Sequence, residues 1–266
     1  AFLALSRTLG LYRDIAWHAS SEAEKVDILR QFPSAAIIHV VEDPVTLEEG
    51  AQLPDAPGTT NDGTLRLGFI SRISPMKNLD GLLRMLGSTS CRAKLDIFGP
   101  IEDCSYWQLC EDLVGKLPPN VTAAYKGPLA PEDVSRTFAT YDLFPFPTLG
   151  ENFGHVVFEA LRAGTPVLLS DCTPWTHQDT GSITVLSLDD SDGWRAAFHH
   201  AARRTPDERH HLRQATRAYA ETYARNSGTR KQNLALFEAV ARRNGAAGPS
   251  GSDSAASHVK ESSTGR

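Results

Sequence analysis

Short runs of apolar residues recur along residues 64–190, and each is bounded by glycine, proline or polar turn residues. Their β-branched and aromatic content predicts buried β-strands at residues 65–70, 94–98, 121–125, 143–146, 166–169 and 183–186. The stretches between them predict helices near residues 78–87, 103–117, 130–140 and 154–163. Strands that alternate with helices predict an α/β domain with a mainly parallel sheet and helices on both faces.

The pattern is less regular before this domain. Residues 1–19 predict one short helix or the remnant of one, and Ser21 and Glu24 have the spacing of a capping box that begins a second helix. A β-branched run at residues 36–41 predicts a buried strand. Residues 43–63 are rich in proline, glycine, aspartate, asparagine and threonine, which indicates a linker.

Longer helical stretches, near residues 190–204, 206–225 and 228–243, follow the last predicted strand. The segment 244–266 is mostly glycine, serine and alanine with scattered charges, so we expect it to be disordered. The chain begins with Ala1 and a sequence typical of the middle of a domain, so we expect that further sequence precedes it.

The chain has 266 residues, of which 41% are hydrophobic, enough for one well-packed domain with additional elements. A net charge of −5 without a dense basic run disfavours nucleic acid or an anionic membrane as a partner recognised through bulk charge. No apolar run approaches the roughly 20 residues that cross a bilayer. The four cysteines show no CxxC pair, so we expect reduced thiols and a cytoplasmic protein, with peripheral attachment to the inner face of a membrane left open.

Candidate chemistry lies in three loops that follow predicted strands, because ligands bind beyond the carboxyl ends of the strands in an open parallel sheet. The first loop carries Arg72 and Lys77, which are either solvated charges or an anion-binding pair. The second begins at Gly99, which by itself indicates only a turn. The third carries Glu151 and ends at Gly154 before a helix, where exposed amides and the helix dipole favour phosphate.

Glu159 lies in the predicted helix 154–163, whose neighbouring residues are almost all apolar, so we expect this helix and its glutamate to be buried. A buried ionised carboxylate is costly unless something binds it. We therefore expect Glu159 to meet either the hydroxyl groups of a ligand or a basic side chain. A structural salt bridge to Arg162, three residues further on, is the alternative.

The remaining reactive side chains in this region do not predict a second site. A histidine at a helix start, such as His155, is more often structural or exposed than catalytic. Cys172, His177 and Asp179 lack both a nucleophile elbow and the spacing of metal ligands, so we expect neither a catalytic triad nor a metal centre.

Glu151 and Glu159 lie eight positions apart, and with their surroundings they resemble the E-x7-E signature of the retaining family 4 glycosyltransferases. Gly68, Arg72 and Lys77 resemble the G-x3-R-x4-K loop of that family. Further similar blocks follow in the family's order at residues 98–100, 125–127, 141–147 and 159–167. The resemblance extends from about residue 36 to residue 240. It implies the Rossmann-like C-terminal half of a two-domain GT-B fold, with the N-terminal domain largely missing.

The resemblance also implies a nucleoside-diphosphate sugar as the donor, with no metal or other cofactor. Arg72 and Lys77 would hold the diphosphate and neutralise the charge that grows on the leaving group. Glu151 would contact hydroxyls of the donor sugar near the reacting carbon, and Glu159 would bind the two ribose hydroxyls. The other donor-binding positions that it implies, many of them through main-chain groups, are Gly99, Lys126, Gly127, Asn152, Phe153, Gly154, His155 and Val156.

The implied organisation is a remnant of an acceptor domain (1–42), a linker (43–63), a nucleotide-sugar-binding domain (64–227) and a crossover helix (228–243) before the tail. The rest of the acceptor domain would be supplied in cis or in trans, and without it the apolar face of the crossover helix would be partly exposed. Asn78 departs from the family pattern, in which glycine is frequent. The acceptor (a glycan, lipid or small molecule) stays open. A non-catalytic nucleotide-binding or interaction module and a GT-B sugar-nucleotide epimerase or phosphorylase remain alternatives.

Overall fold

The computed structural model describes residues 2–12, 15–45 and 63–243. Its main domain contains two parallel three-stranded sheets, one ordered β3-β4-β5 and the other β6-β7-β8. Their bounds are β3 Leu65–Ile70, β4 Ala93–Phe98, β5 Val121–Gly127, β6 Phe144–Phe146, β7 Val167–Ser170 and β8 Ile183–Leu186. The strands predicted from the apolar runs are confirmed, with ends that differ by a few residues.

The two sheets meet at β3 and β6. Leu67 and Leu143 form a parallel bridge, and the amide of Gly68 donates to the carbonyl of Leu143 at 3.3 Å. The chain therefore runs outward from β3 to β5, returns to β6 beside β3, and then runs outward in the other direction to β8. In an α/β sheet, a reversal of strand order of this kind opens a crevice at the carboxyl ends of the two central strands.

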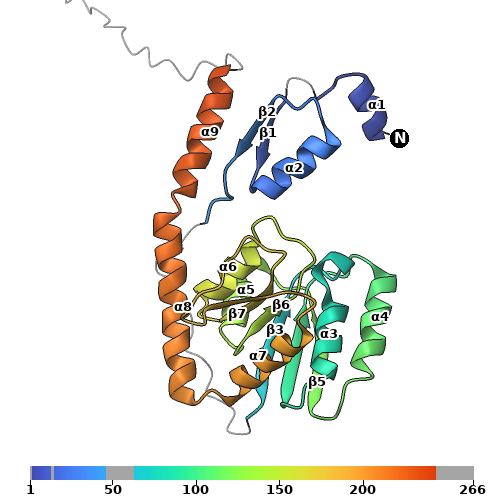
Figure 1. The fold of residues 1–266 in the computed structure, drawn as a ribbon, viewed down its shortest axis with the longest axis vertical. Helices are drawn as coiled ribbons and strands as arrows, with labels where there is room; N and C mark the ends of the chain where they lie inside the picture. Colours follow the sequence, from blue (N-terminus) through green and yellow to red (C-terminus); the bar gives the residue numbers. More distant parts are fainter. Residues whose placement is uncertain (1, 13–14, 46–62, 244–266) are drawn as a thin grey trace, which may run out of the picture.

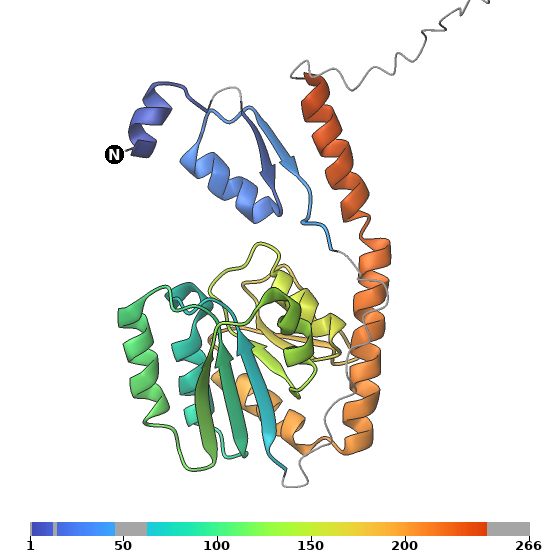
Figure 2. The same ribbon diagram turned by 180° about the vertical axis from the view of Figure 1, so that it is seen from behind.

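Helices cover this sheet in two groups (Figures 1 and 2). Helix α3 (Leu79–Gly87) packs against α4 (Cys104–Val114) and α7 (Ser191–Arg203). Helix α6 (His155–Arg162) packs against α5 (Pro131–Phe138) and α8 (Pro206–Asn226). Each helix turns its apolar side inward, so the core is continuous between the layers and includes Phe69, Phe146 and Trp194. The predicted α/β architecture is thereby confirmed.

The N-terminal unit consists of α1 (Phe2–Thr8), β1 (Ala16–Ala19), α2 (Glu22–Gln31) and β2 (Ile37–Val40). The prediction of a short helix within residues 1–19 is confirmed for Phe2–Thr8, but its extension to residue 19 is wrong, because a strand follows the helix and pairs in parallel with β2. The reason is tertiary. Besides this pairing, Trp17 contacts Phe32 at the end of α2, with ring centroids 4.6 Å apart.

The cap of α2 differs in one detail from the predicted capping box. The Ser21 hydroxyl accepts the hydrogen bond of the Glu24 amide at 3.1 Å, as the spacing predicts. The Glu24 carboxylate instead accepts from both the amide and the hydroxyl of Ser20 at 2.7 Å. The carboxylate therefore ties the preceding residue, at the end of β1, to the helix start.

Helix α9 (Thr229–Arg243) leaves the main domain and runs beside the N-terminal unit (Figure 1). The Asn233 side chain donates to the Glu42 carbonyl at 2.8 Å, which fastens α9 to the segment after β2. As predicted, part of its apolar side is exposed, with Leu234 at 60% and Phe237 at 65%, whereas Leu236 is buried. None of the helices in the described ranges is long and apolar enough to cross a membrane.

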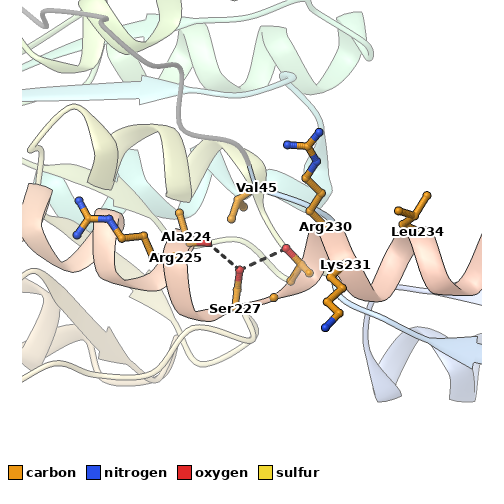
Figure 3. Close-up of a pocket in the computed structure, with 9 residues that line it drawn as sticks. Val45, Ala224, Arg225, Ser227, Arg230, Lys231 and Leu234 are labelled. Atoms are coloured by element: carbon orange, nitrogen blue, oxygen red, sulfur yellow. Dashed lines mark hydrogen bonds between the residues drawn. The ribbon is translucent and has the colours of Figure 1, made fainter.

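A hollow of about 390 Å³ lies where α8 passes into α9, around Gly228 with its φ of 60° (Figure 3). The Ser227 hydroxyl bridges the α8 carbonyl of Ala224 at 3.4 Å and the Thr229 hydroxyl at 3.3 Å. The basic side chains of Arg225, Arg230 and Lys231 are among its lining residues. The hollow contains no residue of the three candidate loops.

The predicted linker and tail lie mostly outside the described residues, at 46–62 and 244–266. The proposed limits of the domains therefore stay predictions. Two consecutive residues, at the end of the N-terminal unit and the start of the linker, contact the main domain. His155 lies 3.4 Å from the Asp43 carboxylate, and the Tyr223 hydroxyl donates to the Glu42 carboxylate at 3.0 Å.

A buried ion cluster joins the amino ends of the two central strands. Asp142, immediately before β6, accepts from the guanidinium of Arg66 on β3 at 2.8 Å and lies 3.0 Å from Arg209 on α8. Burial alone would raise the pKa of the Asp142 carboxyl, but the hydrogen bonds from Arg66 and the charges of Arg66 and Arg209 outweigh it and hold the pKa below its ordinary value. The cluster keeps β3 and β6 side by side, which is the arrangement on which the crevice depends.

We expect Asp142→Asn to lower the free energy of unfolding by roughly 3 kcal/mol, because Arg66 and Arg209 stay buried without their counter-charge. Asp142 has a depressed folded-state pKa, so its contribution is full above the unfolded value of about 3.9 and is lost as the pH falls through the folded value. Urea unfolding at pH 7, and then at stepwise lower pH, measures both effects. The matched control is Asp27→Asn in an exposed pair with Arg30, where we expect a change within about 0.5 kcal/mol. A loss no larger than that of the control would contradict the assignment.

Candidate functional site

The first and third candidate loops lie together at the carboxyl ends of β3 and β6. The amide of Leu149 donates to the carbonyl of Met76 at 2.8 Å, and the Thr148 hydroxyl donates to the same carbonyl at 3.0 Å. The Asn78 side chain donates to the Pro147 carbonyl at 2.8 Å. These bonds fix one loop against the other without using the charged side chains, which remain available for a ligand.

Asn78 occupies a left-handed backbone conformation, with φ 55° and ψ 42°, at the start of α3. Asparagine tolerates this region better than most residues other than glycine. The departure from the family's glycine is therefore compatible with the same backbone. A Cβ at Gly81 would come within 2.4 Å of the Asn78 side-chain oxygen, so a glycine in the next turn provides the room for the larger residue.

Lys77 and Glu151 form the centre of the site. Their ammonium and carboxylate groups are 2.5 Å apart, although 74 positions separate them in the chain. The two side chains are only 10% and 17% exposed, and the ammonium lies 5.5 Å from the centre of the Phe146 ring. A charge pair held in a largely dry crevice interacts more strongly than one on the surface. The predicted convergence of a cation and an acidic side chain on one edge of the sheet is present.

Glycine 154 sets the position of Glu151. Its φ is 80°, and a Cβ there would meet the Glu151 Cγ at 2.9 Å and a Val157 methyl at 3.3 Å. The Glu151 amide donates to the Cys172 carbonyl at 3.1 Å, which ties the loop to the end of β7. The Glu151 side chain thus lies close to the Gly154 backbone, and the Glu151 main chain is held by the hydrogen bond to Cys172.

Arg72 lies on the same loop as Lys77 but is 61% exposed. Its guanidinium donates to Glu102 at 2.8 Å, in the loop after β4. Glu102 is not among the residues predicted for the site, because an acidic residue that follows Gly99 and Pro100 is a weak signal. An exposed pair of this kind is weak, about 0–1 kcal/mol, so Arg72 is free to exchange Glu102 for an anionic ligand.

The second loop and the end of β5 lie side by side. The amide of Gly99 donates to the carbonyl of Gly127 at 3.0 Å, and the Tyr125 hydroxyl donates to the carbonyl of Gly99 at 2.8 Å. The Lys126 ammonium turns toward Asp96 on β4, at 3.6 Å. The role that the resemblance implies here, through the main chain around Lys126, stays a prediction.

The start of α6 completes the edge of the sheet. Phe153 is buried and accepts, through its carbonyl, the indole N–H of Trp175 at 2.6 Å, whereas Asn152 and His155 are exposed. Val156 is half-buried on the first turn. The first amides of a helix have no partner within it and carry a partial positive charge. The helix begins at His155, shortly after Glu151 in the chain, so its start favours an anionic group at this edge of the sheet.

Glu159 does not have the burial that the apolar helix predicted. Val157, Phe158, Ala160 and Leu161 are buried, but Glu159 lies on the flank of α6, is half-buried, and has an interaction partner within the chain. Helical geometry explains the difference, because not every residue of a largely apolar helix points into the core. Burial alone therefore does not require a ligand at Glu159, and the binding of the ribose by this residue stays a prediction.

Cys172 has the properties of an unreactive thiol. It is exposed, and desolvation and the neighbouring Asp171 raise the pKa of its thiol, which disfavours the nucleophilic thiolate. Among the residues that the structure describes, no group of three or more histidine, cysteine, aspartate or glutamate side chains is arranged to hold a metal ion.

The cations, the carboxylate and the main-chain amides of the site can bind a ligand that combines an anion with hydroxyl groups. The ammonium, the guanidinium and the amides of α6 suit phosphate oxygens. The carboxylate suits hydroxyl donors, because an ionised carboxylate only accepts hydrogen bonds. Both functions lie at the crevice where the strand order reverses.

Residues 55–178 match the model of the family described as glycosyl transferases group 1. The chain is also 30% identical over 139 residues to a D-inositol 3-phosphate glycosyltransferase of Mycobacterium marinum, and 29% identical over 116 residues to that of Rhodococcus erythropolis. These matches include 50% and 41% of this chain. They span 29% and 26% of the two curated relatives, so the chain matches less than a third of either length.

Solved structures share the fold at low sequence identity. Anabaena HepE in complex with UDP-glucose is 17% identical, with a TM-score of 0.67 over 90% of this chain and 67% of HepE. The sucrose-phosphate synthase of Thermosynechococcus elongatus is 15% identical, with a TM-score of 0.66 over 90% of this chain and 62% of that enzyme. The pneumococcal O-GlcNAc transferase GtfA, in complex with UDP and GlcNAc, is 17% identical, with a TM-score of 0.55 over 84% of this chain and 45% of GtfA. The observed fold is therefore Rossmann-like and related to GT-B proteins.

Proposed function

Since residues 55–178 match the model of glycosyl transferases group 1, we propose that this chain binds a nucleoside-diphosphate sugar and contributes to the transfer of that sugar to an acceptor. The contact between Lys77 and Glu151 carries the proposal. It brings a phosphate-binding cation and a hydroxyl-binding carboxylate to one point of the crevice, and a nucleotide sugar has its diphosphate directly beside the sugar ring.

The charged side chains of the site are already paired without a ligand, and ligand binding would change their partners. Lys77 and Glu151 neutralise each other, and Arg72 is paired with Glu102. A bound diphosphate would take the two cations, and the sugar hydroxyls would take the Glu151 carboxylate. Lys77, Glu151 and Arg72 would each exchange one partner for another, and Glu102, whose side chain is 39% exposed, would be solvated by water. Little of the cost of burying these charges would therefore remain uncompensated.

The same groups suit the chemistry of transfer. Cleavage of the bond between the sugar and the diphosphate moves negative charge onto the phosphates. Fixed cations and the start of α6 stabilise that developing charge more than they stabilise the ground state, and only such a difference accelerates the reaction. We propose retention by attack on the same face of the sugar, as the family resemblance implies. A covalent route would need a carboxylate at the anomeric carbon.

We propose UDP as the nucleotide part of the donor. HepE and GtfA, which share the fold, are in complexes with UDP, and HepE is also in a complex with UDP-glucose. The charge of the diphosphate would be met by Arg72, Lys77 and the amides of α6, so we expect binding without a metal ion. The acceptor domain implied by the family resemblance would act in cis or in trans.

Calorimetric titration of the whole chain with UDP, GDP and ADP, each with and without EDTA, tests the proposal. We expect UDP to bind most tightly, EDTA to leave its affinity unchanged, and Glu159→Ala to weaken the binding through loss of hydrogen bonds to the ribose. Tighter binding of GDP or ADP would refute UDP as the donor nucleotide, and failure of all three nucleotides to bind would refute the proposed function. Binding without transfer, even with an acceptor domain added, would favour a non-catalytic module, and a changed rather than transferred sugar would favour an epimerase.

A further inference from the structure

A small pocket lies beside the loop between α7 and α8, at the end of the main domain that is remote from the N-terminal unit (Figure 1). Its charged lining residues are Asp142, Arg204, Arg209 and Arg213, and its other lining residues are apolar. Asp142 lies directly before β6, so the pocket is at the amino ends of the central strands. The proposed donor site is at their carboxyl ends. The pocket is therefore a separate place in the fold, and none of its lining residues belongs to the three candidate loops.

Positive charge is in excess around this pocket. Arg66 and Arg209 both pair with the Asp142 carboxylate, at 2.8 and 3.0 Å. Arg213 is buried and donates to two main-chain carbonyls before β6, at 2.5 and 2.8 Å, but forms no ion pair within the described ranges. With Arg204, four guanidinium groups of the described chain lie around one buried carboxylate.

Arg204 is the arginine that the protein leaves without a partner. Its side chain is half-buried and forms no hydrogen bond or ion pair with any residue that the structure describes. Glu208 on the first turn of α8 attracts Arg204, but its carboxylate accepts from the amide and the hydroxyl of Thr205 at 2.8 and 3.1 Å. A guanidinium has five N–H donors, so Arg204 can donate several hydrogen bonds to a ligand in the pocket.

The pKa values of two arginines reflect this excess of positive charge. Burial and the charge of Arg209 lower the pKa of Arg204 below its ordinary value. Burial and the charge of Arg217 lower the pKa of Arg213 to about 10. Both groups stay protonated at neutral pH, so their repulsion persists in the folded chain. An anion placed between them would reduce the electrostatic cost of their burial.

The size of the pocket restricts the anion. Its free space is about 10 Å³, which is about the room that one water molecule needs. A phosphate or a carboxylate has several heavy atoms and does not fit without displacing the walls, whereas a single halide ion does. The side chains of Pro166, Ala201 and Leu212 form the apolar part of the lining and offer no hydrogen bonds. The guanidinium groups therefore have to hold the ion.

We propose that this pocket binds a chloride ion, held by Arg204 and Arg213. Asp142 is already engaged with the other two arginines, so the ion belongs beside the pair that has no counter-charge. Bound chloride would join α8 and the loop before it to the segment that precedes β6, and so stabilise the folded chain. The inference is independent of the proposed function, because it concerns the opposite edge of the sheet.

Urea unfolding of the whole chain tests this inference, in a series where chloride replaces gluconate stepwise at constant ionic strength. Constant ionic strength keeps the general screening of charges unchanged, and gluconate is too large for the pocket. At a chloride concentration about ten times the dissociation constant, a site that exists only in the folded chain lowers the unfolding equilibrium constant about tenfold. We expect this decrease, with saturation, in the wild type.

Arg204→Met is expected to weaken chloride binding by about tenfold or more, the effect of losing a hydrogen bond from a charged group. In gluconate alone we expect this variant to be more stable than the wild type, because a repelled cation is removed. Arg203→Met is the matched control, since it removes the same charge from an exposed neighbouring position and should keep the chloride dependence. The line width of the chloride-35 NMR signal measures binding directly, and we expect broadening with the wild type and the control that Arg204→Met loses.

The opposite results are equally specific. A wild type without a saturating chloride dependence, or an unchanged dependence in Arg204→Met, would refute the chloride site. Displacement of the chloride by added inorganic phosphate would overturn the assignment to a single halide ion. If Lys77→Met abolishes the chloride dependence and Arg204→Met does not, the ion binds at the proposed donor site and the inference fails. These titrations contain no nucleotide, so their failure leaves the proposed function standing.

Discussion

Replacement of Lys77 by methionine is expected to weaken UDP binding by about tenfold to a hundredfold, because a hydrogen bond to a charged group contributes about 1.5–3 kcal/mol. Methionine keeps most of the length and apolar surface of the lysine stem, so packing over Phe146 is largely preserved. The same change leaves the Glu151 carboxylate without its counter-charge, at a position where its side chain is only 17% exposed. We therefore also expect the free energy of unfolding to fall by about 1–3 kcal/mol.

The double variant Lys77→Met/Glu151→Gln separates these two effects. In the double variant the side chain at position 151 is uncharged, so no unpaired charge stays buried. We therefore expect the free energy of unfolding to return toward that of the wild type, while UDP binding stays weak. Calorimetry measures the affinity, and urea unfolding measures the stability. Lys116→Met, at an exposed position after α4, controls for loss of a positive charge. Wild-type affinity in Lys77→Met would place the diphosphate elsewhere on the molecule.

Gly99→Ala is expected to have the largest effect on stability of any single substitution in the three loops. Gly99 has a φ of 135°, and a Cβ there would lie 1.8 Å from the carbonyl oxygen of Ser71. Neither the backbone conformation nor the contact can be relieved by turning a side chain, because the colliding atom belongs to the main chain. We expect a loss of more than about 4 kcal/mol, or a displaced first loop with no measurable UDP binding.

Gly87→Ala at the end of α3 is the matched control. No atom lies within 4 Å of a Cβ at this position, and its φ is not in the left-handed region. We expect this variant to be neutral, or stabilised by up to about 1 kcal/mol, because alanine reduces the freedom of the unfolded chain. Urea midpoints and slopes compare the two variants. Equal stability of the two would contradict the steric account of the second loop.

The local pattern of apolar and polar residues was sufficient to predict the strands and helices of the main domain. The apolar runs and the helical stretches between them predict strands and helices because both depend on burial at short range along the chain. Their order also placed the three loops at one edge of the sheet, since parallel strands share their carboxyl ends. The spacing of Arg72, Lys77, Glu151 and Glu159 supported the resemblance to a family before any contact was known.

Local pattern failed where long-range contacts decide the conformation. The β1 strand depends on pairing with β2 and on the Trp17–Phe32 contact, so residues 1–19 resembled a helix or its remnant in isolation. Glu102 takes its place opposite Arg72 only because β3 and β4 lie side by side. The tyrosines of α8 reach Phe153 and Trp175 only in the folded chain.

The class of fold, the loops that carry the chemistry, and the glycines and charges within these loops follow from residue type and spacing over a few positions. Three other features follow from the packing of distant segments: β6 returns beside β3, Lys77 meets Glu151 across 74 positions of chain, and Glu159 is half-buried. Such pairings depend on the packing of the whole core, and no local period encodes them.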